Sequence, residues 1–115
     1  MGRQHILLDP VAADAVALLG LLVREARVRY GWTQADLAAR AGVSARTVSA
    51  VESGAGSTSI GAVFNVVVAA GVRLFDFSPL ELSSALRRTN DTVVLLPKRI
   101  RPKAWPDLNL VNVDF

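Results

Sequence analysis

Residues 31–54 read GWTQADLAARAGVSARTVSAVESG, and the spacing of apolar residues and glycine in this stretch decides the fold. Leu37 lies on the inner face of a first short helix, while Val48 and Val51, three residues apart, give a second helix its buried face. Gly42 lies between the two helices, where a sharp turn requires a positive φ that glycine adopts without strain. Two short helices joined by a tight glycine-containing turn indicate a helix-turn-helix arrangement.

Polar residues predict where these two helices begin. Thr33, with Asp36 three residues further on, can cap the first helix. Ser44, whose hydroxyl can face the backbone N–H of Thr47, can cap the second.

The sequence on either side predicts two further helices and a strand. Asp9 and Pro10 make a favourable helix start, and apolar residues at helical spacing continue to about residue 29. A second apolar run predicts a helix over residues 60–70. Residues 72–77, VRLFDF, favour a short C-terminal β-strand, because Val and Phe are strand formers. The predicted fold is mainly α, with four to five helices and a strand at 72–77.

Leu18 and Leu21 widen the apolar stripe of the first helix. A wide stripe is typical of a helix that other elements cover on more than one side. We therefore expect this helix to be buried on two faces.

Residues 78–115 are predicted to form a C-terminal extension. Ser78-Pro79 can open a helix that ends at residue 86 or 88, Asn90-Asp91 indicates a turn, and residues 92–96 favour a second short strand. Residues 97–104, PKRIRPKA, hold four cations and no acid. This basic segment can add phosphate affinity, bind a protein partner or serve as a solvated linker. The predicted organisation is an N-terminal arm at 1–11, a helix-turn-helix domain at 12–77 and the extension at 78–115.

Composition narrows the classes of function. A chain of 115 residues favours one domain, and a net charge of +3 suits a polyanionic partner. The chain has no cysteine and a single histidine, His5, so we expect no disulfide, no metal site, no cofactor and no enzymatic activity. The apolar run at 15–23 is too short to span a bilayer, and no cleavage site follows it. We therefore expect a cytoplasmic protein without a membrane partner.

The central motif resembles the Xre/Cro-like, or lambda-repressor-like, helix-turn-helix family. The wider resemblance extends from about Val16 to Phe77. Residues 31–34, GWTQ, together with the predicted order of helices and strand, are closest to the HipB-type antitoxins within this family. The matching positions of the motif itself are dispersed from its first to its last helix: Gln34, Ala38, Gly42, Val43, Val48, Val51 and Glu52.

The resemblance implies the residues of a DNA interface. In this family the second helix of the motif lies in the major groove, and its first residues meet base edges. Arg46 is the predicted specific reader, since arginine binds guanine O6 and N7 together. Arg27 and Glu52 match a structural ion pair of the family. The remaining base contacts implied by position are Ala45, Ser49 and Ala50, and the phosphate contacts are Gln34, Ser44, Thr47 and Arg40.

The resemblance also implies a function. It indicates a sequence-specific DNA-binding transcriptional regulator that acts as a homodimer on a palindromic operator. Likeness to HipB-type antitoxins adds repression of its own operon and neutralisation of a HipA-like toxin kinase. In those proteins the C-terminal strand pairs across the dimer axis, which here places Leu74, Phe75 and Phe77 in the interface. The alternative is an inhibitory protein-binding module with secondary or lost DNA binding, since the recognition helix has few hydrogen-bond donors.

Overall fold

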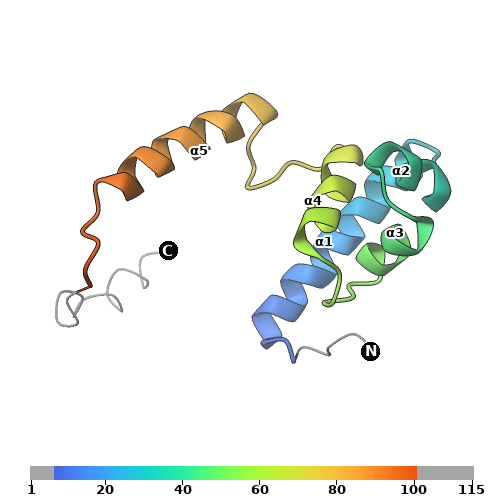
Figure 1. Ribbon diagram of the computed structural model, residues 1–115. Helices are drawn as coiled ribbons and strands as arrows, with labels where there is room; N and C mark the ends of the chain where they lie inside the picture. The colour runs from blue at the N-terminus through green and yellow to red at the C-terminus, as the bar shows by residue number, and fades with distance from the viewer. Residues whose placement is uncertain (1–6, 101–115) are drawn as a thin grey trace. The chain divides into compact units, whose positions relative to one another are not determined.

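A computed structural model describes residues 7–100 of the chain (Figure 1). This part divides into two compact units between Leu82 and Ser83, and the last helix crosses the division. The fold is mainly α, as predicted. The helices of the described residues are α1 (Pro10–Arg29), α2 (Gln34–Ala41), α3 (Ala45–Glu52), α4 (Ile60–Ala69) and α5 (Pro79–Val94).

Polar side chains begin the helices at the predicted residues. The Asp9 carboxylate accepts a hydrogen bond from the backbone N–H of Val11 at 2.8 Å, just before Pro10. Thr33 and Asp36 form a reciprocal capping box at the start of α2. These contacts satisfy backbone N–H groups that have no partner inside a helix. The predicted starts of α1 and α2 are thereby confirmed.

Helices α1 to α4 share one core. Gly42, at φ 71°, turns the chain between α2 and α3, so that the apolar faces of both helices meet the core. Leu37, Val48 and Val51 are buried, in agreement with the sequence. Each of the four helices contributes to the buried apolar set, which consists of Val23, Leu37, Ala38, Val48, Val51, Val66, Val67 and Ala70.

A glycine inside α1 sets the distance between α1 and α3. Gly20 is buried, and a Cβ atom at this position would lie 2.3 Å from the carbonyl oxygen of Val51. A side-chain carbon does not approach a nonbonded oxygen so closely, so only glycine allows the two backbones to meet here without a shift. The sequence did not indicate this role for Gly20, because a lone glycine within a helix signals only a low helix propensity.

The expectation that α1 is buried on two faces is wrong. Leu18 and Leu21 are both more than half exposed, while Val23 on the inner face is fully buried. The other helices of this unit cover one side of α1 only. The second apolar stripe of α1 therefore lies on the surface of the unit.

The strand predicted at 72–77 is replaced by a tight turn. Phe75 and Asp76 have φ values of 55° and 61°, and the backbone N–H of Phe77 donates to the carbonyl of Leu74 at 2.9 Å. Two consecutive left-handed residues reverse the chain, so residues 72–77 cannot form one continuous strand. Side chains are strained in this region of backbone conformation, at a cost on the order of 1–3 kcal/mol.

The second strand predicted at 92–96 is also wrong, and so is the turn at Asn90-Asp91. Helix α5 continues through both to Val94. Ser78 and Glu81 cap its start reciprocally, at 3.2 and 2.8 Å, and no residue of α5 is buried. Asn and Asp side chains destabilise an exposed helix only slightly, because they can hydrogen-bond to water instead of to the helix backbone. None of the helices in residues 7–100 is long and apolar enough to cross a membrane.

Candidate nucleic-acid interface

Helix α3 has one buried face and one exposed face. Val48, Val51 and Glu52 are buried, whereas Arg46 and Ser49 are exposed. Ala45 at the first position is exposed and Ala50 is half-buried. The outer face of α3 thus exposes Ala45, Arg46 and Ser49 and part of Ala50, and the inner face holds the helix in the core.

An ion pair joins α1 to the end of α3. The Arg27 guanidinium donates to the Glu52 carboxylate through Nε at 2.6 Å and through Nη2 at 2.9 Å. Its Nη1 donates to the backbone carbonyl of Trp32 at 2.8 Å. The side chains of Arg27 and Glu52 are only 13% and 5% exposed. Because three donors of one side chain bind two separate segments, the pair orients α3 and the start of α2 together.

The environment keeps Glu52 ionised. Burial of the carboxyl raises its pKa, but hydrogen bonds from Arg27 and Gln34 and the charge of Arg27 outweigh burial and lower the pKa below its ordinary value. The hydrogen bond to Glu52 likewise raises the pKa of Arg27 above its ordinary value. Both groups therefore stay charged, and the pair persists throughout the neutral pH range.

Gln34 is tied to the same pair. Its Nε2 donates to Oε1 of Glu52 at 3.2 Å, and its side chain is half-buried. An amide nitrogen carries two N–H groups, so one remains for another acceptor. Phosphate contact by Gln34 stays a prediction, and Glu52 sets the orientation from which it would be made.

Ser44 and Thr47 lie together at the first turn of α3. The Ser44 hydroxyl accepts a hydrogen bond from the backbone N–H of Thr47 at 3.1 Å, and the two hydroxyl oxygens are 3.0 Å apart. Ser44 therefore caps the helix, as predicted from its position. Either hydroxyl can donate in the contact between Ser44 and Thr47, so the hydrogen of the other hydroxyl is what remains for a phosphate.

Arg40 belongs to an aromatic stack that the sequence analysis missed. Its guanidinium carbon lies 4.0 Å from the ring centroid of Trp32, and Trp32 stacks on Tyr30 with centroids 4.5 Å apart. The ring attracts the cation electrostatically. Eight residues separate Trp32 from Arg40, and the chain turns between them, so no helical spacing indicated this contact. The stack occupies a face of the guanidinium, whereas its N–H donors lie in the plane, so a phosphate contact by Arg40 stays a prediction.

Arg46 differs from Arg27, which pairs with Glu52, and from Arg40, which stacks on Trp32. It is exposed, and within residues 7–100 its side chain has no hydrogen-bond or ion-pair partner. A long cation without an internal partner is free to reach an external acceptor.

Residues 7–100 contain no group of three His, Cys, Asp or Glu side chains placed to hold a metal ion.

The residues predicted for the dimer interface lie in and around the turn after α4. Leu74 is half-buried and packs against the core of its own unit, and Phe77 is also half-buried. Phe75, at the tip, is 71% exposed. Of these three side chains, Phe75 is the one that the fold leaves most available.

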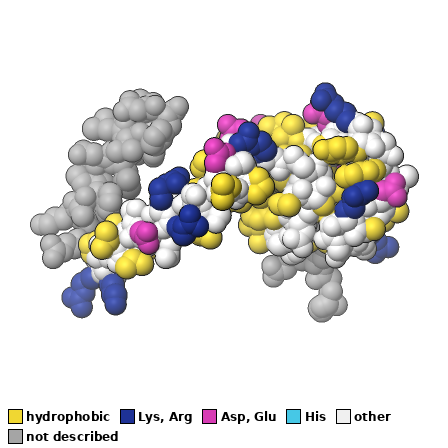
Figure 2. Space-filling model, turned by 90° about the horizontal axis from the view of Figure 1, so that it is seen from above, with side chains coloured by type: hydrophobic (Ala, Val, Ile, Leu, Met, Phe, Trp, Pro, Cys, Tyr) yellow, Lys and Arg dark blue, Asp and Glu magenta, His cyan; other side chains and the backbone are white. Residues whose placement is uncertain are grey.

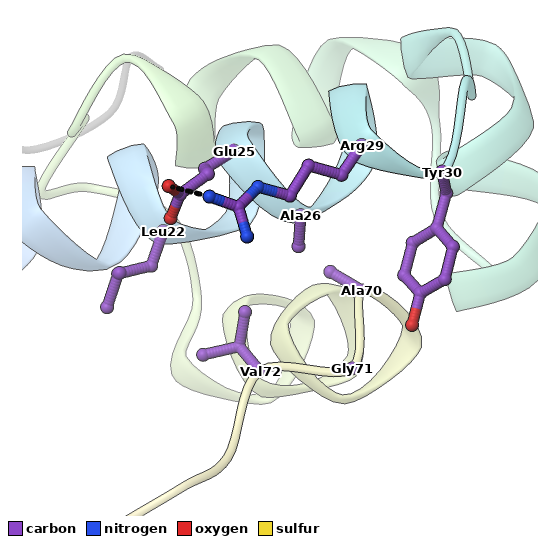
Figure 3. Close-up of a pocket in the computed structure, with 8 residues that line it drawn as sticks. All are labelled: Leu22, Glu25, Ala26, Arg29, Tyr30, Ala70, Gly71 and Val72. Carbon is purple, nitrogen blue, oxygen red and sulfur yellow. Dashed lines mark hydrogen bonds and ion pairs between the residues drawn. The ribbon is translucent and has the colours of Figure 1, made fainter.

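An open pocket lies between the second half of α1 and the end of α4 (Figure 3). Its volume is about 390 Å³. Its two charged residues, Glu25 and Arg29, bind each other at 3.0 Å. Neither α2 nor α3 lines the pocket, so it is separate from the surface predicted to meet DNA. Its apolar lining includes Leu22, Ala26, Ala70 and Val72.

Comparison with protein families matches residues 23–77 to the helix-turn-helix family. The match begins in the second half of α1, contains α2, α3 and α4, and ends after the turn at Phe75. These residues therefore form an Xre/lambda-repressor-like helix-turn-helix domain, which supports a role in DNA binding and transcription regulation. Comparison with curated proteins found no match, and comparison with solved structures found none.

Proposed function

We propose that the protein is a sequence-specific DNA-binding regulator whose reading element is α3. The observation that carries this proposal is the contrast between the two faces of α3. Val48, Val51 and Glu52 anchor it, and Arg46 extends from the opposite face without a partner among residues 7–100. A recognition helix needs both properties, because a base contact is selective only when its position is held by the fold.

In this proposal Arg46 reads one base pair, and Ala45, Ser49 and Ala50 complete the contact with bases. Apolar contact from the alanines suits thymine methyl groups. Gln34, Ser44 and Thr47 hold the phosphate backbone, with Arg40 as a weaker contact. Few donors on α3 leave part of the selectivity to the shape and deformability of the DNA.

The test is a binding assay with DNA from upstream of the protein's own gene. Arg46→Ala is expected to lose about 1–3 kcal/mol of discrimination at one base pair, measured by fluorescence anisotropy against single-base variants. Gln34→Ala serves as the matched comparison and should weaken binding to all DNA sequences alike. Equal losses on specific and random DNA for Arg46→Ala would show that this side chain contacts only phosphate.

We further propose that the regulator acts in the cytoplasm as a homodimer and has no catalytic activity of its own. One helix-turn-helix unit contacts few base pairs, so two units on a palindromic operator, about one helical turn apart, give useful selectivity. The likeness of residues 31–34 to HipB-type antitoxins supports repression of its own operon and neutralisation of a HipA-like kinase. Co-purification with the product of the neighbouring gene tests the antitoxin role.

A second candidate is a toxin-neutralising module with secondary or lost DNA binding. The observation that favours it is that the exposed face of α3 has a single charged hydrogen-bond donor. A helix that reads bases selectively usually has more donors. A gel shift on the upstream DNA separates the two candidates. No shift, together with a stable complex with the neighbouring gene product, would favour the second.

A further inference from the structure

Phe75 is placed at the tip of a turn in a way that the stability of its own unit does not explain. Its ring is 71% exposed and its backbone is left-handed. Exposure of the apolar ring and the unfavourable backbone conformation each cost free energy. Leu74, the preceding residue, packs against the core, and the backbone bond between Leu74 and Phe77 closes the turn. The turn is thus anchored from below and projects a single aromatic side chain.

The open pocket lies beside this turn. Val72, which lines the pocket, precedes Phe75 by only three residues, while Phe75 itself is not among the lining residues. The pocket is apolar along Leu22 and Ala26, and at about 390 Å³ it has room for an aromatic ring. Figure 2 shows patches of apolar side chains on the surface of this unit. A projecting aromatic side chain and a largely apolar recess therefore lie within three residues of each other along the chain, on one compact unit.

A projection beside its own complement fits a two-fold axis. In an isologous dimer the same patch appears on both copies, so each projection enters the recess of the other copy. A single reciprocal contact then satisfies both features on both chains. We propose that Phe75 inserts into the α1–α4 pocket of a second copy of this chain, which identifies the interface of the homodimer in the proposed function.

The charges at the rim of the pocket favour a second copy over an unrelated partner. Glu25 and Arg29 are one helical turn apart on α1, and their side chains are 55% and 77% exposed. When two such helices meet in antiparallel orientation, Arg29 of each copy faces Glu25 of the other. The rim is thus complementary to itself in charge. Leu18 and Leu21 continue the same helix as exposed apolar surface and extend the contact.

Disulfide trapping between two different variants tests the insertion directly, because the chain has no cysteine. Phe75→Cys and Leu22→Cys proteins are mixed, so that a bond between the two positions can form only between chains. We expect rapid formation of the mixed disulfide dimer. The control replaces Phe75→Cys by Ile60→Cys, since Ile60 is also 71% exposed but begins α4, at the end away from the pocket. Equal trapping rates in both mixtures would overturn the proposal.

Sedimentation equilibrium of the full chain gives the second readout. Phe75→Asp should raise the dimer dissociation constant on the order of 10- to 100-fold, whereas Ile60→Asp should leave it unchanged. Glu25→Arg and Arg29→Glu should each weaken the dimer, and the double exchange should restore it. Unchanged dissociation constants in the single variants, with native circular dichroism, would place the interface elsewhere.

The two proposals fail in different ways. Arg46→Ala should leave dimerisation intact while it reduces base discrimination, and Phe75→Asp should reduce operator affinity by reducing the population of dimer. A wild-type protein that is monomeric at hundreds of micromolar, yet still binds the operator, would overturn the interface and leave DNA binding in place. A dimer that traps as expected but binds no DNA would contradict the proposed function and support the interface.

Discussion

Helices α2 and α5 begin in the same way and differ in everything that follows. Thr33 and Asp36 cap α2 reciprocally, and Ser78 and Glu81 cap α5 with the same pattern of bonds. Yet α2, with 8 residues, buries Leu37 and Ala38, while α5, with 16 residues, buries none. Capping sets where a helix starts, but packing against other elements decides what that helix contributes to stability.

Two ion pairs of the chain differ in burial in the same way. Arg27–Glu52 lies inside the first unit and is nearly excluded from water, whereas Arg73–Glu81 at the start of α5 is more than half exposed on both sides. Removing one partner of a buried pair leaves an uncompensated charge, while an exposed pair is replaced by water. Substitutions can therefore test whether burial is the difference that matters.

The largest effect is expected at Glu52. Glu52→Ala should lower the free energy of unfolding by about 3–5 kcal/mol, because the buried Arg27 guanidinium loses its partner. The measurement is urea denaturation followed by circular dichroism. Arg73→Ala is the control, since it removes the exposed partner of Glu81 and should cost at most about 1 kcal/mol. Similar losses in both variants would show that burial does not distinguish the pairs.

Acid should weaken the first unit through the same residue. The pKa of Glu52 is lowered in the folded chain, so the unfolded chain binds its proton more readily as the pH falls. The stability contributed by Glu52 is fully present above the ordinary glutamate pKa of 4.5 and is lost as the pH falls through the lowered value. Denaturation midpoints measured from neutral pH downward should show this loss. Glu52→Gln should flatten it, and an unchanged slope would exclude Glu52 as its source.

An intermediate effect is expected where α1 meets α3. Gly20→Ala should destabilise the chain by about 1–3 kcal/mol or more, because its Cβ would overlap the Val51 carbonyl. Gly61→Ala is the matched control in α4, where no atom lies within 4 Å of the added carbon. This control should be neutral or gain up to about 1 kcal/mol. Thermal melts of both variants decide whether the close approach of α1 and α3 is real.

The smallest effects concern the two capping boxes. Thr33→Ala should cost about 1 kcal/mol of global stability, because α2 unfolds together with the core that it helps to form. Ser78→Ala removes the equivalent bond from α5, but should leave the main unfolding transition unchanged and only shorten the helix at its start. Melts that shift equally for both variants would mean that α5 unfolds with the core.

Much of the first unit could be predicted from local chemistry. The caps at Asp9, Thr33 and Ser44 and the glycine at position 42 act within a few residues of where they stand. Such short-range signals survive in any tertiary setting, so the helix starts predicted from them agree with the structure. The inner faces of α2 and α3 followed from spacing for the same reason.

The sequence predicted which residues of the candidate interface are exposed, but not the side-chain contacts that orient them. Exposure of Arg46 and Ser49 follows from their place opposite Val48 and Val51 on one helix. The stack of Arg40 on Trp32 and the bond from Gln34 to Glu52 join separate segments. No local pattern encodes such contacts, so the orientation that they impose on Arg40 and Gln34 was not foreseen.

By itself, the sequence determined which segments of the first unit become helices and where they start, because capping bonds and apolar periodicity operate over single turns. Only the tertiary structure decided the rest. It placed the α3 backbone against Gly20, left Leu18 and Leu21 at the surface, and reversed the chain at Phe75 where strand propensity alone pointed to extension. The physical reason is that strand propensity is weak and depends on a pairing partner, whereas the packing of Leu74 into the core constrains the backbone directly.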